Sequence, residues 1–314
     1  MPFLTKEVFE GIGGHLFLAT GSNNVVSLFS QEMAERQKLT QTWTELLVGR
    51  GTRLAASGVK YLHCFVPDKL SIYREEAADL WTGLSSPAEQ IETQQDKDLR
   101  PYLVPLTAYL LKQKQRHLLF FHNDTHWTIE GCFSAYQMLC AYLGINQRED
   151  LINSPAAQVE LSGDLGGKLN PPRKEIFRFG SFGKSATRVH ANRLVLLRES
   201  GVLSNNVNLH VGSIVRFTNG SSESTKRLLI FGDSFCEYRT HLLTGLLADT
   251  VSDLMFVWSA SIDYGIVESF APDVVITEIA ERFMARLPTD DVDLGAHAEK
   301  KVSEALDAAG RKTP

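Results

Sequence analysis

Three short apolar runs in the last third of the chain constrain the fold most strongly. They are LLIF (228–231), LMFVWS (254–259) and DVVITEI (273–279), and a helix-like segment, 262–270, separates the last two. Continuous apolar runs of this length are typical of strands buried on both faces, as in parallel sheets. Strands that alternate with helices in this way predict an α/β fold with a mostly parallel sheet flanked by helices.

The first half of the chain fits the same plan. Apolar residues recur at helical spacing over 32–57, and VKYLHCFV (59–66) reads as a buried strand that ends at Pro67. We interpret 12–18 and 117–122 (HLLFFH) as two further short strands. The polar segment 84–100 is expected to be a loop with a helix start.

We treat residues 1–314 as a single domain. Within it, 151–226 has no clear periodicity and is expected to be an irregular insertion with short strands. The charged segment 291–309 predicts a surface helix, so that 291–314 forms a surface helix and tail.

The first motif that carries chemistry is GDSF, directly after the strand 228–231. Gly232 permits a tight turn, and Ser234 is expected at the start of the next helix, where backbone N–H groups can bind an oxyanion. Because active sites in parallel sheets lie at the carboxyl ends of the strands, Ser234 is a candidate nucleophile. Gly-Asp-Ser is also ordinary turn chemistry, with Asp233 as a cap.

The second motif is DTHW (124–127), which follows the predicted strand 117–122. A serine hydroxyl needs a base, which is usually a histidine oriented by a carboxylate, so we predict His126 as the base and Asp124 as its partner. Taken alone, the pair is better explained as a helix-entry segment with Asp124 as a cap and His126 on the surface. A metal site lacks an obvious third ligand, and none is predicted.

With both motifs in place, the chain resembles the alginate O-acetyltransferase family of the SGNH hydrolase superfamily. The resemblance extends in order over roughly residues 10–285, in the blocks GHLFL (14–18), FVPDKLSIY (65–73), DTHW…G (124–131), GDL (163–165), FGDSF (231–235) and PDVVI…ER (272–282). It implies an SGNH-like, flavodoxin-like sheet in which Asp124 and His126 precede the catalytic Ser234, an order permuted relative to most SGNH hydrolases.

The implied reaction is transfer of acetyl groups to polysaccharide hydroxyls through an acetyl-serine. The resemblance implies no cofactor. The implied partners of the protein are a carbohydrate acceptor and an acetyl donor, and a partner protein is one option for the donor. The chain departs from the family at Cys132, where a small alanine is common, and in showing no further carbohydrate-binding module.

Several residues are weaker candidates for oxyanion or substrate binding. Arg282 follows a buried strand and could contact a sugar or the acyl donor, although Glu281 and Arg282 also read as the start of a solvated helix, which we favour. Trp127 could stack on a sugar but is more typical of the core. Tyr238 either lines the site or packs beneath it, and Lys69 is interpreted as structural. The full set is Gly232, Asp233, Phe235, Tyr238, Trp127 and Arg282.

Composition excludes some classes of function. The net charge is −5 and the pI about 6.0, so no basic face for nucleic acid is indicated. No run of about 18 apolar residues exists, and none is expected to span a membrane. The four cysteines form no CxxC pair and read as buried free thiols. The lack of a signal segment predicts a cytoplasmic protein, whereas the resemblance favours the periplasm.

Three functions therefore stay open at this point. The first is a serine-dependent O-acetyltransferase acting on a glycan, and the second is a carbohydrate acetylesterase with the same three residues and water as acceptor. The third is a glycan-binding protein that keeps the fold without catalysis.

Overall fold

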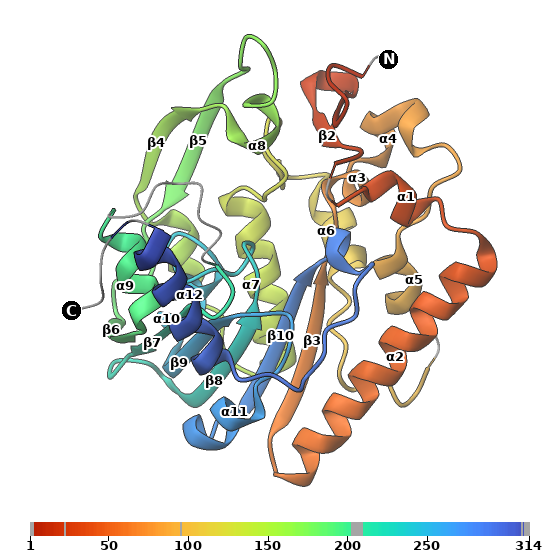
Figure 1. Ribbon diagram of the computed structural model, residues 1–314. Coiled ribbons are helices and arrows are strands. Elements are labelled where there is room, and N and C mark those ends of the chain that lie inside the picture. The colour runs from red at the N-terminus through yellow and green to blue at the C-terminus, as the bar shows by residue number, and fades with distance from the viewer. Residues whose placement is uncertain (1–2, 22, 95, 202–209, 309, 311–314) are drawn as a thin grey trace.

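The computed structural model describes residues 3–21, 23–94, 96–201, 210–308 and 310 (Figure 1). A six-stranded sheet lies at its centre in the order β3-β10-β8-β9-β7-β6. The strands are β3 (Lys60–Val66), β6 (Thr187–Ala191), β7 (Ile214–Thr218), β8 (Ser224–Gly232), β9 (Val251–Trp258) and β10 (Val274–Ala280). The first four strands of this order pair in parallel, and β7 and β6 pair antiparallel. The predicted α/β class with a mostly parallel sheet is confirmed.

Two small hairpins accompany the central sheet. One joins β1 (Val8–Glu10) to β2 (Leu16–Leu18), and the other joins β4 (Ala156–Leu161) to β5 (Glu175–Gly180). Figure 1 shows them as separate projections at the top of the molecule, the first near the N-terminus. The segment 151–226 thus holds the β4–β5 hairpin and also supplies β6 and β7 to the central sheet.

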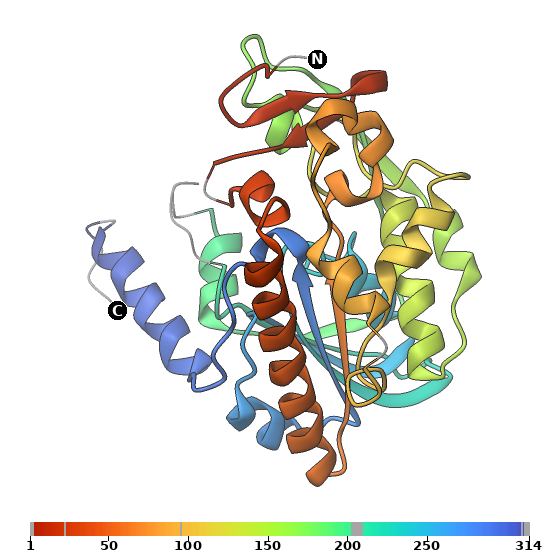
Figure 2. The same ribbon diagram turned by 90° about the vertical axis from the view of Figure 1, so that its right-hand side faces the viewer.

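The helices include one long element and many short ones. The 24-residue α2 (Met33–Ala56) packs along β3, and Figure 2 shows it running from the middle of the molecule to its lower end. The other α-helices are α1 (Val25–Phe29), α3 (Lys69–Ile72), α4 (Arg74–Ala77), α5 (Pro87–Thr93), α6 (Leu106–Gln113), α7 (Ile129–Leu143), α8 (Gly163–Gly166), α9 (Arg193–Glu199), α10 (Leu243–Ala248), α11 (Tyr264–Phe270) and α12 (Leu294–Ala308). Short 3-10 turns are η1 (Ile12–Gly14), η2 (Ala78–Trp81), η3 (Glu149–Asn153) and η4 (Glu281–Phe283).

Most predicted elements are present within a few residues of their expected positions. The helix over 32–57 is α2, the strands 59–66 and 273–279 are β3 and β10, and 84–100 contains α5. The predicted C-terminal helix is α12, which buries one side against α9; residues 309 and 311–314 of that tail lie outside the described residues. No helix among the described residues is long and apolar enough to cross a bilayer, and all four cysteines are buried free thiols.

Two expectations near the candidate site are wrong. Residues 117–122 form no strand of the sheet: Phe120 makes only an isolated bridge to Trp127, although Leu119 and Phe120 are fully buried. The apolar pattern of a sequence reports burial, and it does not distinguish a buried strand from a buried segment without strand pairing. Likewise no helix starts at Ser234, because 234–242 forms turns and bends, and α10 begins at Leu243.

Helix α7 approaches the DTHW segment closely because it carries a glycine on that side. Thr128 caps its N-terminus through a hydrogen bond from the Gly131 N–H (3.2 Å), and Gly144 ends it in a left-handed conformation. A methyl group on Gly131 would lie 2.1 Å from the Leu119 carbonyl oxygen and 2.8 Å from the Trp127 Cβ. The helix therefore cannot keep this position with any larger residue at 131.

We predict that Gly131→Ala lowers the free energy of unfolding by about 1–3 kcal/mol, because the methyl group overpacks a fixed backbone. Gly49→Ala in α2 is the matched control: nothing lies within 4 Å of its added methyl, so helix propensity should raise stability by up to about 1 kcal/mol. Urea unfolding measures both. Equal effects of the two substitutions would contradict the close packing of α7.

Candidate active site

Ser234 lies just beyond the end of β8, in a turn held by the neighbouring aspartate. One carboxylate oxygen of Asp233 accepts the Phe235 N–H (2.9 Å), and the other accepts the Ala280 N–H at the end of β10 (2.8 Å). The Asp233 N–H donates to Glu278 Oε2 (2.9 Å). These bonds tie the serine turn to the adjacent strand, so the position of Ser234 is set by the sheet.

Gly232 makes this arrangement possible by having no side chain. A Cβ there would lie 2.8 Å from Glu278 Oε2 and 3.1 Å from the Cys236 Cβ. Glu278 is buried, and its burial next to the charge of Asp233 raises its pKa well above the usual value. Burial and the neighbouring Asp233 thus both favour the neutral form of the Glu278 carboxyl group beneath the serine turn.

The structure brings the three predicted residues into one chain of hydrogen bonds. His126 Nε2 lies 2.8 Å from Ser234 Oγ, and His126 Nδ1 lies 2.7 Å from Asp124 Oδ1. The same Asp124 oxygen accepts the His126 backbone N–H (2.8 Å). Asp124 accepts a hydrogen bond from His126 Nδ1, so the ring proton of neutral His126 is on Nδ1. The Nε2 atom is then free to accept the proton of the serine hydroxyl.

A fourth residue, the acidic Asp164 of α8, supports this chain. Its N–H donates to Asp124 Oδ2 (2.8 Å), and its carboxylate accepts the Thr125 N–H (2.7 Å) and the Thr125 hydroxyl. Gly163 allows the contact: it has a φ of +67°, and a Cβ there would lie 2.5 Å from the Asn123 carbonyl oxygen. The block GDL was visible in the sequence, but no role for Asp164 was predicted.

The charges in this chain of hydrogen bonds favour the protonated form of His126. Burial of the His126 ring opposes its charged form, but the hydrogen bond from Nδ1 to Asp124 and the Asp124 charge outweigh it and raise the His126 pKa above its usual 6.5. Burial works against the Asp124 carboxylate too, yet its bonds to His126 lower its pKa to about 2. Asp124 is thus ionised at neutral pH and favours a proton on His126.

Asp124, His126 and Asp164 are also the group in the described part of the chain whose ligand atoms could meet a metal ion, all within 4.8 Å. However, His126 Nδ1 is engaged by Asp124, and both Asp164 oxygens are engaged by Thr125. We assign these atoms to the hydrogen-bonded chain.

The Ser234 hydroxyl and the His126 ring open into a cavity of about 520 Å³. Much of its wall is apolar and comes from α7, the β4–β5 hairpin and the end of β9, including Trp127, Phe177, Phe179 and Trp258. Arg239 also lines it and forms an ion pair with Glu237, which takes a φ of +36°, a strained value for a residue with a side chain. The cavity next to the serine is large enough to hold part of a small organic molecule.

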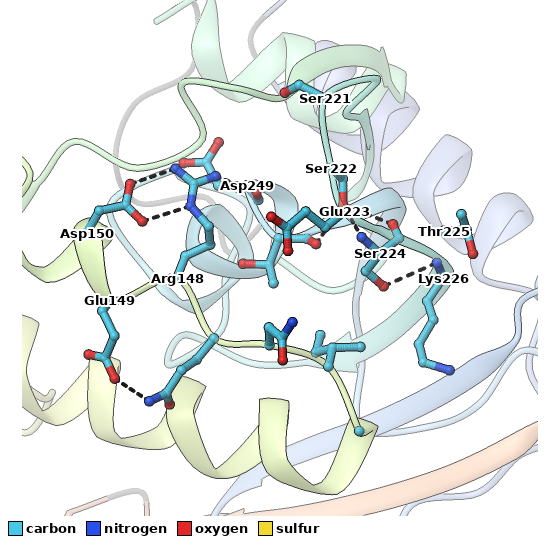
Figure 3. Close-up of a pocket in the computed structure, with 15 residues that line it drawn as sticks. Arg148, Glu149, Asp150, Ser221, Ser222, Glu223, Ser224, Thr225, Lys226 and Asp249 are labelled. Carbon is cyan, nitrogen blue, oxygen red and sulfur yellow. Dashed lines mark hydrogen bonds and ion pairs between the residues drawn. The ribbon is translucent and has the colours of Figure 1, made fainter.

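A larger hollow, of about 650 Å³, lies at the other end of the sheet (Figure 3). It is lined by 144–150, 221–226, Asp249 and Thr250, around the end of α7 and the starts of β8 and β9. Figure 3 shows Arg148 paired with Asp150 at its edge. No histidine is among its described lining residues, so it offers no counterpart of the Ser234–His126 pair.

The weaker candidates have more varied positions. Trp127 is buried and also lines the cavity, whereas Phe235 is buried behind it and packs its ring on His126 (centroids 4.9 Å apart). Tyr238 is buried, with the Arg198 guanidinium 5.6 Å from its ring centre. Tyr238, Phe235 and Arg282 are not among the described residues that line the cavity.

The expectation that Glu281 and Arg282 begin a solvated helix is wrong. Both are buried in the 3-10 turn η4, and Arg282 lies over the Phe235 ring (5.2 Å) with its Nη1 3.6 Å from Asp68 Oδ2. The Glu281 carboxylate accepts the Asp68 N–H (2.8 Å) and the Ser71 hydroxyl (2.6 Å). Sequence alone could not locate these partners, which are more than 200 positions away.

Comparison with known proteins identifies the family. A family model described as "SGNH hydrolase-like domain, acetyltransferase AlgX" matches residues 9–175, which include Asp124 and His126 but not Ser234. The chain belongs to this AlgX-type family of SGNH hydrolase-like acetyltransferase domains. No curated protein matches it.

Several solved structures share the fold. The O-acetyltransferase domain of Pseudomonas putida AlgJ is 18% identical, with a TM-score of 0.54, covering 94% of this chain and 99% of that one. Bacillus cereus PatB1 is 13% identical (TM-score 0.53; 92% and 98% covered). Pseudomonas aeruginosa AlgX is also 13% identical (TM-score 0.52; 98% and 68% covered). At these identities the likeness establishes the fold alone.

We predict that the His126 ring titrates with a midpoint above pH 6.5 and that Asp124→Asn moves it below 6.5. The substitution removes the charge that favours the imidazolium and leaves the burial that opposes it. NMR titration of the ring protons measures this, with His190 on β6 as an internal control. An unchanged midpoint in the variant would show that Asp124 does not control the base.

Proposed function

We propose that this protein is a serine-dependent O-acetyltransferase that moves acetyl groups to hydroxyls of a polysaccharide or other glycan through an acetyl-serine. The observation that supports it best is the unbroken Asp124–His126–Ser234 chain, with spacings of 2.7 and 2.8 Å, at the wall of a cavity. Membership of the acetyltransferase family supports acyl transfer, which requires an acyl donor and an acceptor.

In the first half-reaction, Ser234 Oγ attacks the carbonyl carbon of the donor while His126 Nε2 takes the hydroxyl proton. The tetrahedral intermediate then collapses, the bond to the leaving group breaks, and His126 returns the proton to that group. Asp124 steadies the imidazolium between these steps. The product is an acetyl ester on Ser234.

In the second half-reaction, a sugar hydroxyl enters the cavity and attacks the acetyl-serine. His126 takes the proton of that hydroxyl and then gives it to Ser234 Oγ as the ester bond breaks. The acetyl group leaves on the sugar, and the enzyme returns to its starting state.

The negative oxygen of each tetrahedral intermediate needs a donor, and the Ser234 N–H is available for it within the described turn 233–237. Among the described residues of this turn, Asp233, Phe235, Cys236 and Glu237 donate their N–H groups to Glu278, the Asp233 carboxylate or the Asp233 carbonyl. The N–H of Ser234 has no such acceptor. We assign Ser234 N–H, rather than Asp233 or Phe235, to the oxyanion.

Hydrolysis of acetyl esters is the second candidate, since the His126 side chain is 30% exposed and water can reach it from the cavity. The same three residues would act, with water replacing the sugar hydroxyl. The two reactions differ only in which acceptor reaches the acetyl-serine first.

We predict that Ser234→Ala lowers turnover of nitrophenyl acetate on the order of 10⁴-fold or more and abolishes labelling by a sulfonyl fluoride. His126→Ala should remove turnover while unfolding remains cooperative. Bacillus cereus PatB1 has been solved with a sulfonyl adduct, which makes this class of reagent a natural choice. Equal labelling of wild type and Ser234→Ala would refute the assignment of the nucleophile.

We further predict that an oligosaccharide acceptor diverts acetyl groups from acetate to the sugar. The donor ester is incubated with and without the acceptor, and acetylated sugar and free acetate are quantified, with Ser234→Ala as the blank. Acetate release that no tested acceptor alters, with no acetylated sugar, would favour the esterase.

A further inference from the structure

The segment that carries the base is buried but has no place in a sheet. Residues 121–124 lie between the isolated bridge at Phe120 and the start of α7, and Phe121, Asn123 and Asp124 are buried. Buried backbone N–H and C=O groups need partners. In a strand these partners would be backbone groups, but here charged side chains supply many of them.

Three of the four carbonyl groups of the segment converge on one buried ammonium, and that of Asn123 accepts the Leu165 and Gly166 N–H groups. Lys69 is 1% exposed, and its Nζ donates to the carbonyl oxygens of Phe121 (2.6 Å), His122 (2.7 Å) and Asp124 (3.3 Å). Three N–H donors thus meet three carbonyl acceptors, which uses the full donor capacity of an ammonium group. The three bonds fix the direction in which the chain enters the DTHW turn.

The N–H groups of the same segment converge on a carboxylate from the β4–β5 hairpin. Glu175 Oε1 accepts the N–H of Asn123 (2.5 Å), and Oε2 accepts that of His122 (3.2 Å). Lys69 and Glu175 therefore hold the segment through its carbonyl groups and its N–H groups respectively. We call the two residues the backbone clamp.

We propose that the backbone clamp positions His126 against Ser234, and that Lys69 and Glu175 are positioning residues for the acyl transfer. This inference rests on the proposed function. Neither residue is among the described residues that line the catalytic cavity, so each acts through the backbone that carries Asp124 and His126.

The clamp is itself fixed to the serine side of the site. Lys69 is the first residue of α3, whose cap Asp68 donates its N–H to Glu281 (2.8 Å). The preceding residue of β10, Ala280, donates its N–H to Asp233 in the serine turn (2.8 Å). Lys69, through Asp68, and Ser234, through Asp233, are thus both connected by hydrogen bonds to the carboxyl end of β10. This shared connection keeps His126 Nε2 within 2.8 Å of Ser234 Oγ.

Four carboxylates around Lys69 favour its ammonium form, whereas burial opposes it. Burial lowers its pKa to about 7, and the carboxylates of Glu175, Asp124, Asp164 and Asp68 act in the opposite direction. His15 packs on the same side, and its own pKa is lowered to about 3 by burial and the charge of Lys69, so it adds no competing positive charge at neutral pH.

The test compares Lys69→Met and Glu175→Gln with wild type in nitrophenyl acetate turnover. We expect kcat to fall about 100-fold for Lys69→Met and about tenfold for Glu175→Gln, with KM changed less than about threefold, since misplacement of a base by 1 Å costs about 10²-fold. Circular dichroism and thermal melts establish that each variant is folded. A purely structural role would lower Tm without changing kcat of the folded protein.

Lys114→Met is the matched control. Its Nζ also donates to a backbone carbonyl, that of Ile72 at the end of α3 (2.6 Å), but contacts no part of 121–126. It should leave kcat within about twofold of wild type. If Lys69→Met does not fold, the kcat of Glu175→Gln decides whether the backbone clamp positions His126.

A kcat within twofold of wild type in folded Lys69→Met, or in Glu175→Gln when it decides, would overturn the clamp. Ser234→Ala is measured in parallel: if it is inactive while the clamp variants are unimpaired, the clamp fails and the proposed function stands. If Ser234→Ala is as active as wild type, the proposed function fails instead.

Discussion

The two bonds at the carboxyl end of β10 hold the halves of the site together. Ala280 N–H donates to the Asp233 carboxylate and fixes the serine turn, and the Glu281 side chain accepts the Asp68 N–H and fixes the start of α3. The nucleophile and the base are 108 residues apart in sequence, so their 2.8 Å contact depends on a shared reference in the sheet. The carboxyl end of β10 is the common point of attachment for Ser234 and His126.

Buried ionisable side chains recur around the candidate site. Burial raises the pKa of Glu281 to about 7, although hydrogen bonds from Ser71, Ser86 and the Asp68 N–H act in the opposite direction. A buried carboxylate or ammonium is tolerated only where several hydrogen bonds replace its water, and removing one member leaves the others unpaired. Such groups specify one arrangement of the backbone, which a site needs when a base must be placed within a fraction of an ångström.

The sequence located the four parallel strands of the central sheet and the three candidate residues that the structure joins by hydrogen bonds. Strands β8, β9 and β10 are apolar runs buried on both faces, and that pattern is local. Ser234, His126 and Asp124 were predictable because each carries a side chain whose chemistry is known. The run HLLFFH was not predictable, since burial without pairing leaves the same apolar pattern as a strand. The partners of the supporting residues were not predictable for a related reason: Lys69, Glu175 and Glu281 are charged residues whose partners lie elsewhere in the chain. Lys69 was interpreted as structural without its partners, and Glu281 was expected in a solvated helix.

The central claim is that Ser234 carries the acetyl group between donor and acceptor. Mass spectrometry of peptides from protein mixed with an acetyl ester and quenched in acid within one turnover tests it most directly. The account predicts one acetyl group on the peptide that contains Ser234, formed in wild type and absent in His126→Ala. An acetyl group on another residue, or turnover without any acetylated peptide, would contradict it.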